Sequence, residues 1–109
     1  MREELLKERP QRCPTHPGEI IKEDVLPTLK LSVTQAAKEM HITRQTLHRI
    51  ISKSHGVSPE MALRLGRFCG NGPYLWLAMQ QRYDLFQAEE RIGDDIEKIP
   101  EHSMASRAH

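Results

Sequence analysis

The sequence predicts an all-α protein built from five helices. Apolar residues recur at helical spacing, as in Val33, Ala36, Ala37 and Met40, which occupy positions i, i+3, i+4 and i+7. Residues that favour helix starts precede several of these stretches. Aromatic residues make up only 5% of the chain. We therefore expect a small helical bundle whose core consists of leucine, isoleucine, methionine and alanine.

The first helix is expected to begin at the motif HPGE, residues 16–19. Either Thr15 or His16 would be the N-cap, and Pro17 occupies the first helical position that proline favours. Pro27 should bend or end this helix, because proline lacks an N–H donor. Its buried side would consist of Ile20, Ile21, Val25 and Leu26.

Two short helices joined by a tight turn are predicted within residues 32–51. Ser32 precedes the first of them, and Gln35 three residues later completes a capping box. Thr43 is the expected N-cap of the second. The apolar face of that second helix would be formed by Leu47, Ile50 and Ile51.

The outward face of the second helix suggests a ligand. At 100° per residue, Gln45, Arg49 and Ser52 point away from the apolar face, flanked by His48 and Lys53. Arginine and glutamine match guanine and adenine edges in bidentate fashion. An ordinary solvated helix face is the alternative, but such faces are dominated by glutamate and lysine, and this helix has no carboxylate. The pattern is typical of a DNA-reading helix-turn-helix.

A fourth helix is predicted to start at Ser58-Pro59 and to end at Gly70, in the position after a helix where glycine is preferred. Leu63 points off its apolar stripe, which indicates a second buried surface. The stripe facing the core would be formed by Met61, Leu65 and Phe68.

The fifth and longest helix should run from Gly72-Pro73 to about Glu90, followed by a short turn or broken helix. Its large apolar residues are spaced three, four and three apart, a seam that can pack on the core and on another subunit. The seam is formed by Trp76, Met79, Tyr83 and Phe86, and Leu63 of the fourth helix is placed with it as a core or dimer contact. These patterns divide the chain into an N-terminal arm (1–14), a DNA-binding and dimerisation domain (15–92) and a tail (93–109) whose end is expected to be disordered.

Charge is distributed unevenly along the chain, although the net charge is only +1. Residues 1–29 carry five basic and six acidic side chains, and residues 71–109 carry four basic and seven acidic ones. Residues 30–70 carry seven basic and two acidic side chains, a net charge of +5. The positive charge is therefore concentrated around the proposed reading unit, where phosphates would lie.

Other classes of function find little support. No apolar run approaches membrane-spanning length, and the N-terminus is too charged for a secretory signal, so we expect a cytoplasmic protein. Cys13 and Cys69 are expected to be free thiols. A zinc site from Cys13, His16 and Cys69 is conceivable, but no metal-ligand spacing supports it. The six histidines and two cysteines form no catalytic spacing, and we expect no enzyme activity, cofactor or metal.

Five segments together resemble the HigA-type, or VapI-like, antitoxin branch of the phage-repressor (XRE) helix-turn-helix family. The similarity covers residues 15–90. It is carried by HPGE (16–19), LSVTQAA (31–37), TRQTLHRII (43–51), SPEMALRLG (58–66) and LWLAMQ (75–80). The resemblance implies a five-helix, lambda-repressor-like DNA-binding domain that forms a homodimer, binds a palindromic operator in its own promoter and represses it. Many members also neutralise a HigB-type ribonuclease toxin; a solitary regulator without a toxin is the alternative.

By position, the resemblance also implies individual roles. The residues that would touch bases or the adjacent backbone are Thr43, Arg44, Gln45 and Arg49. Those that would approach phosphates are Ser32, Thr34, Lys38, Thr46 and Lys53. His41 departs from the family pattern, which usually has glycine in the turn. We therefore expect His41 to adopt a left-handed or otherwise bent conformation, with some strain.

Overall fold

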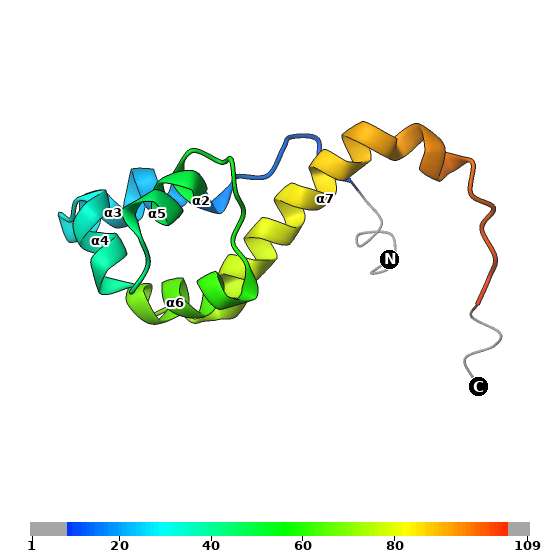
Figure 1. The fold of residues 1–109 in the computed structure, drawn as a ribbon. Helices are drawn as coiled ribbons and strands as arrows, with labels where there is room; N and C mark the ends of the chain where they lie inside the picture. The colour runs from blue at the N-terminus through cyan, green and yellow to red at the C-terminus, as the bar shows by residue number, and fades with distance from the viewer. Residues whose placement is uncertain (1–8, 105–109) are drawn as a thin grey trace.

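Five helices form the regular structure of residues 9–104, the part of the chain that the computed structural model describes. The elements are α2 (Pro17–Ile20), η1 (Ile21–Val25), α3 (Leu26–Leu29), α4 (Val33–Glu39), α5 (Arg44–Ile51), α6 (Pro59–Cys69) and α7 (Pro73–Glu97). The segments α2, η1 and α3 follow one another without a break and make one helix. The prediction of an all-α protein with five helices is confirmed, and α2 to α6 form a compact body (Figure 1).

The first helix begins as predicted but does not end at Pro27. His16 is the N-cap, and its Nδ1 accepts a hydrogen bond of 2.9 Å from the Gly18 N–H. Pro27 was expected to bend or end this helix; it does not end it, since the helix continues to Leu29. The reason is the π-helical turn η1 directly before the proline, in which the Leu26 N–H bonds to the Ile21 carbonyl. This wider turn accommodates a ring that would clash with a carbonyl in a regular α-helix.

The predicted caps are present, with one difference. Ser32 accepts a hydrogen bond of 3.0 Å from the Gln35 N–H, as a capping box requires. The Gln35 side-chain oxygen does not accept from the Ser32 N–H in return; the side chain points to the next turn, where its Nε2 donates to Glu39 Oε2 at 3.3 Å. Only half of the predicted capping box therefore forms. Thr43 caps α5 and Ser58 caps α6 in the same way as Ser32 caps α4.

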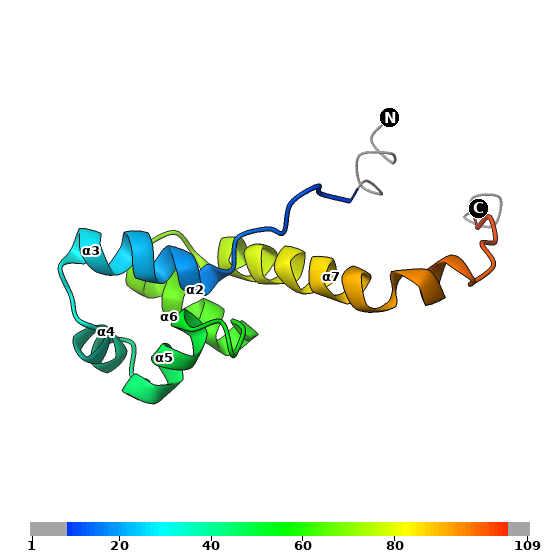
Figure 2. The ribbon, with the colours of Figure 1, turned by 90° about the horizontal axis from the view of Figure 1, so that it is seen from above.

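The hydrophobic core lies between the first helix (α2, η1 and α3), α4, α5, α6 and the first half of α7 (Figure 2). Trp76 of α7 is 1% exposed, and its Nε1 donates to Asn71 Oδ1 at 2.9 Å. Phe68, predicted to face the core, is half-buried at its edge. The other large buried side chains are Ile21, Leu26, Met40, Leu47, Ile50, Val57, Met61 and Leu65.

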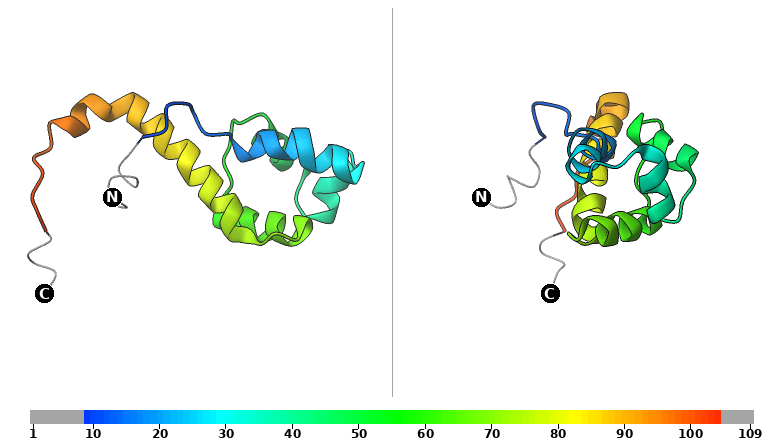
Figure 3. Two further views of the ribbon diagram at one scale, coloured as in Figure 1. Left: turned by 180° about the vertical axis from the view of Figure 1, so that it is seen from behind. Right: turned by 90° about the vertical axis from the view of Figure 1, so that its left-hand side faces the viewer.

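Helix α7 is longer than predicted. It runs without a break from Pro73 to Glu97, so the expected end near Glu90 and the broken segment after it are wrong. Gly93 lies inside the helix: one glycine costs only about 1 kcal/mol of helix stability, and the residues 87–91 just before it (QAEER) are good helix formers. The second half of α7 extends beyond the body of the molecule (Figure 3).

Arg9 holds the segment before the first helix against α7. Its guanidinium carbon lies 4.2 Å from the centre of the Phe86 ring. The same group pairs with Glu89 at 3.5 Å and with Glu90 at 3.0 Å. Of the predicted arm and tail, residues 1–8 and 105–109 lie outside the described residues. None of the helices in residues 9–104 is long and apolar enough to cross a membrane.

Candidate nucleic-acid interface

Helices α4 and α5 are joined by a four-residue turn with a left-handed residue in it. Met40 ends α4, and the Ile42 N–H bonds to the Ala37 carbonyl at 3.0 Å. His41 between them has φ = 60°, which confirms the predicted left-handed conformation. An L-residue with a Cβ is disfavoured there, although histidine is tolerated better than a β-branched residue. The two helices thus form the predicted helix-turn-helix.

The first helix crosses the C-terminal end of α5 at very close range. Gly18 is buried, and a Cβ at this position would collide with the carbonyl group of Ile50. A glycine is therefore required for the two backbones to approach so closely. This contact sets the position of α5 relative to the rest of the body.

The proposed base-reading side chains all face outward. Arg44, Gln45 and Arg49 are exposed on α5, so the outward orientation expected from the helical pattern holds for Gln45 and Arg49. Thr43 is also exposed, but its hydroxyl is already engaged. It accepts from the Thr46 N–H at 3.0 Å and lies 2.8 Å from the Thr46 hydroxyl. Of these four exposed residues, Arg44, Gln45 and Arg49 have the long side chains that extend into solvent.

The proposed phosphate-contacting side chains lie around that face. Thr34 and Lys38 are exposed on α4, and Ser32 at its start is engaged as the cap. Thr46 lies on the first turn of α5. Lys53 follows α5 with φ = 67°. Its Nζ is 3.1 Å from Glu19 Oε1, and this hydrogen bond raises the pKa of Lys53. Lys53 could contact a phosphate only by sharing or leaving Glu19.

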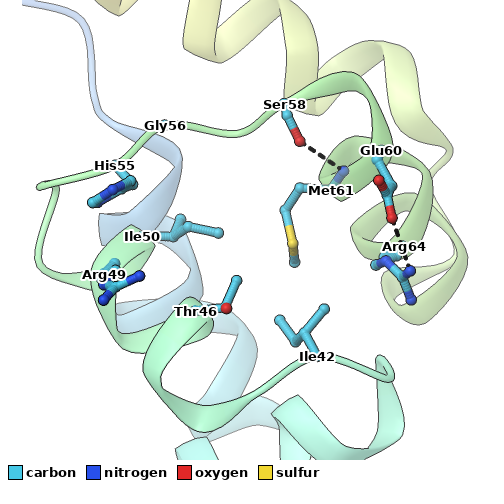
Figure 4. A pocket seen from close by; sticks show the side chains of 10 residues that line it. All are labelled: Ile42, Thr46, Arg49, Ile50, His55, Gly56, Ser58, Glu60, Met61 and Arg64. Carbon is cyan, nitrogen blue, oxygen red and sulfur yellow. Dashed lines mark hydrogen bonds and ion pairs between the residues drawn. The ribbon is translucent and has the colours of Figure 1, made fainter.

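A cavity of about 350 Å³ lies beside α5 (Figure 4). Its apolar wall is formed by Ile42, Ile50 and Met61. Polar side chains at its rim include Arg49 from α5 and the Glu60–Arg64 pair from α6, whose side chains lie 3.0 Å apart. In the sequence, the only signal for Arg64 is its i, i+4 spacing from Glu60.

Gln80 of α7 holds the loop that follows the proposed reading helix. It is 5% exposed, and its Oε1 accepts from the Val57 N–H at 2.8 Å. Its Nε2 donates to Asp84 at 2.9 Å, and Gly56 packs so closely that a Cβ would meet the Gln80 amide. No periodicity marked this residue, because a buried glutamine interrupts an apolar stripe. The loop is therefore fixed to α7.

His16 is the second buried polar side chain at this junction. It is 3% exposed and meets the Tyr83 ring edge-on, with 4.7 Å between ring centres. Burial lowers the pKa of His16, and the nearby Asp84 partly offsets that effect. The neutral ring keeps Nδ1 free to accept from the Gly18 N–H. His16 is thus part of the support for the first helix.

The seam expected on α7 contacts its own subunit. Trp76 lies in the core, Met79 is half-buried against it, and Tyr83 meets His16. Phe86 lies under Arg9. Leu63, which was placed with this seam, is on α6 and is 62% exposed.

The two cysteines lie in different surroundings. Cys13 is exposed, whereas Cys69 is half-buried and burial raises the pKa of its thiol. Within residues 9–104, no group of three or more histidine, cysteine, aspartate or glutamate side chains is arranged to hold a metal ion.

Comparisons with known proteins place this geometry in a family. The helix-turn-helix family model matches residues 21–77. Virulence-associated protein A′ of Dichelobacter nodosus is 42% identical over 90 residues, which cover 80% of this chain and 77% of that protein. The antitoxin HigA of Pseudomonas aeruginosa, solved with the higBA promoter, superposes with a TM-score of 0.76 at 32% identity, covering 81% of this chain and 96% of that one.

An addiction module antidote protein of the HigA family from Coxiella burnetii superposes with a TM-score of 0.78. It is 33% identical, and the match covers 84% of this chain and 100% of that one. The family match extends over more than half of the chain, and the superposition takes in the whole of the Coxiella relative. The chain therefore belongs to the helix-turn-helix family of XRE type, in the branch that contains the HigA-type antitoxins.

Proposed function

We propose that this protein is a sequence-specific DNA-binding repressor and the antitoxin of a toxin–antitoxin pair. In this role it binds the promoter of its own operon and neutralises a HigB-type ribonuclease toxin. The observation that carries the DNA-binding part is the outward face of α5, where Gln45 and Arg49 are exposed and no carboxylate is present. The solved HigA relative that carries promoter DNA supports the same assignment.

In this proposal α5 enters the major groove. Gln45 and Arg49, four residues apart, lie on one side of the helix and reach base edges, while Thr43 and Arg44 lie at its start. Ser32, Thr34 and Lys38 of the preceding helix region approach phosphates, together with Thr46 and Lys53. The net charge of +5 in residues 30–70 favours approach to the DNA backbone.

Replacing Arg49 with alanine should remove a base contact. We expect the Arg49→Ala variant to lose about 1–3 kcal/mol of operator binding and to discriminate less between bases at one position of each half-site. The reason is that an arginine fork pairs with one base edge and not with the others. Competition binding against a set of single-base operator variants measures this loss.

Lys38→Ala is the matched comparison, because it also removes one exposed cation but from α4. It should weaken binding to all sequences alike and reduce the slope of log affinity against log salt by about one. Unchanged base preference in Arg49→Ala, or a sequence-selective loss in Lys38→Ala, would contradict the assigned roles.

Binding to an inverted repeat requires two subunits, and α7 offers a face for pairing. Leu85, Ile92 and Ile96 are 63%, 42% and 49% exposed. At 100° per residue they fall within about 40° of one another, on the side of α7 opposite Trp76 and Tyr83. We define these three residues as the outer stripe. Its spacing of seven and four is typical of helices that pair with helices, so we propose that it joins two copies of the chain.

Ile96→Glu should separate the two copies, because a carboxylate within the apolar outer stripe would be buried in the pair without a partner. The expected result is a monomer by sedimentation equilibrium. This monomer should bind a full operator more weakly than the wild-type protein does. Leu29→Glu is the control, since Leu29 is 44% exposed on α3 and lies away from the stripe. A dimeric Ile96→Glu variant would show that the outer stripe is not the pairing face.

Toxin neutralisation rests on the family and on the acidic C-terminal part, where residues 71–109 carry seven acidic and four basic side chains. Such a surface suits a basic protein partner. The neighbouring reading frame should encode a protein that arrests growth alone and co-purifies with this chain. If it is harmless and unbound, the solitary-regulator alternative holds. Because the proposed target is promoter DNA, we place the protein in the cytoplasm and assign it no catalytic role.

A further inference from the structure

We propose that Arg64 is a positioning residue for DNA recognition: from α6 it holds the turn between α4 and α5 in the left-handed conformation that His41 adopts. The inference rests on the proposed DNA binding and goes beyond it, because Arg64 lies outside the helix-turn-helix.

The contacts of Arg64 join α6 to the turn between α4 and α5. Its Nη1 donates to the Met40 carbonyl at 2.9 Å and more weakly to the His41 carbonyl at 3.4 Å. Its Nη2 donates to Glu60 Oε2, one turn earlier on α6, at 3.0 Å. The side chain is 33% exposed, so it lies partly within the body. Glu60 thus orients the guanidinium, and the guanidinium binds the turn.

The backbone conformation of the turn is unfavourable unless a contact such as that of Arg64 stabilises it. His41 has φ = 60°, a conformation that costs an L-residue energy relative to glycine. The carbonyls on both sides of that strained backbone belong to the C-terminal end of α4, where partial negative charge accumulates. A guanidinium that donates to both carbonyls favours the left-handed form, because a relaxed turn would move at least one of them away. Such charge-assisted hydrogen bonds are stronger than neutral ones.

The turn in turn sets the angle between α4 and α5. The proposed phosphate contacts lie on α4 and the proposed base contacts on α5, so both sets fit one duplex only at the right angle. If the turn relaxes, a smaller fraction of molecules has the competent geometry, and the apparent affinity falls by that fraction. Arg64 would therefore act on DNA binding through His41.

A direct role is the competing explanation. Arg64 lines the same cavity as Thr46 and Arg49, and a cation there could bind a phosphate itself (Figure 4). The two explanations differ in three measurable ways. A phosphate contact adds to the salt dependence, is partly restored by lysine, and does not depend on the residue at position 41. If Arg64 instead holds the turn, a role that we call the clamp, its removal leaves the salt dependence unchanged. Lysine does not restore binding, and the effect depends on the residue at position 41.

The experiment is a double-mutant cycle between Arg64→Met and His41→Gly, with Arg64→Lys as a third variant. Operator affinity is measured by fluorescence anisotropy at several salt concentrations, well below the unfolding temperature of each variant. We expect Arg64→Met to weaken operator binding by roughly tenfold, the size of one charge-assisted hydrogen bond, with an unchanged salt slope. Arg64→Lys should not restore binding. In the His41→Gly background the same Arg64→Met change should cost much less, because glycine adopts the left-handed turn without strain.

Arg67→Met is the control, since Arg67 is exposed three residues further along α6. Equal losses from Arg64→Met in both backgrounds, or recovery by lysine with a salt slope reduced by about one, would overturn the clamp. If Arg64→Met is too unstable to assay, the cycle between Arg64→Lys and His41→Gly gives the same decision. Failure of the wild-type chain to bind any operator would refute the proposed function, whereas normal binding by Arg64→Met would refute only the clamp.

Discussion

Replacing Trp76 with alanine is expected to lower the free energy of unfolding by about 3–5 kcal/mol. Trp76 is 1% exposed and is among the largest fully buried side chains of the described residues. Its removal leaves a cavity between α7 and the other helices and frees the Asn71 side chain that its Nε1 contacts. Because small domains are stable by only about 5–15 kcal/mol, this loss should leave the variant marginally folded. Urea unfolding monitored by far-UV circular dichroism measures the loss.

Tyr74→Ala is the matched control, two residues earlier on the same helix. Tyr74 is 83% exposed, so its removal should change the unfolding free energy by less than about 0.5 kcal/mol. Similar losses from both variants would mean that α7 does not pack on the body through Trp76. This pair of variants therefore tests how α7 is attached, independently of DNA binding.

Of the glycine-to-alanine substitutions, which replace one hydrogen with a methyl group, Gly18→Ala is expected to disrupt the fold most. A Cβ at Gly18 would collide with the Ile50 carbonyl, a backbone group that cannot rotate away. The first helix and α5 must therefore move apart, at a cost of about 1–3 kcal/mol or more. Because α5 carries the proposed base contacts, operator affinity should also fall in molecules that remain folded. Thermal unfolding and anisotropy measurements on the same samples separate the two effects.

Gly93→Ala is the same chemical change with the opposite expected sign. Gly93 lies within α7, and a Cβ there would meet no atom within 4 Å. Alanine should therefore stabilise the helix by about 0.5–1 kcal/mol, because it loses less conformational freedom on folding than glycine does. A destabilised Gly93→Ala variant would indicate that α7 does not continue through this position.

Local signals in the sequence predicted most of the fold. Ser32, Thr43 and Ser58 stand where a side-chain oxygen can accept from an N–H three residues later, and each of them caps a helix. His41 could be assigned a left-handed or otherwise bent conformation because it stands where the resembling family usually has glycine, and its φ is 60°. The exposure of Gln45 and Arg49 followed from the period of α5 alone.

The wrong predictions concern positions where a rule about one residue type was outweighed by the surrounding residues. Pro27 was expected to bend or end its helix; the helix does not end there, because the π-helical turn before it makes room for the ring. Gly93 was taken as part of a broken segment, but one glycine, at a cost of about 1 kcal/mol, does not stop a helix that is already formed by the residues before it. Gln35 was expected to return a bond to Ser32, yet Glu39 one turn away offered its side chain a carboxylate.

The sequence by itself determined the helices, their caps and the outward face of α5, because each depends on residues within a few positions of one another. Only the tertiary structure decided how these parts are held together. The contact of Arg64 with the Met40 carbonyl spans 24 residues, and that of Gln80 with the Val57 N–H spans 23. Periodicity carries no information on such pairs, since a polar side chain bonds to whichever backbone group the packing brings within reach. The position of the proposed reading helix is therefore a property of the folded body.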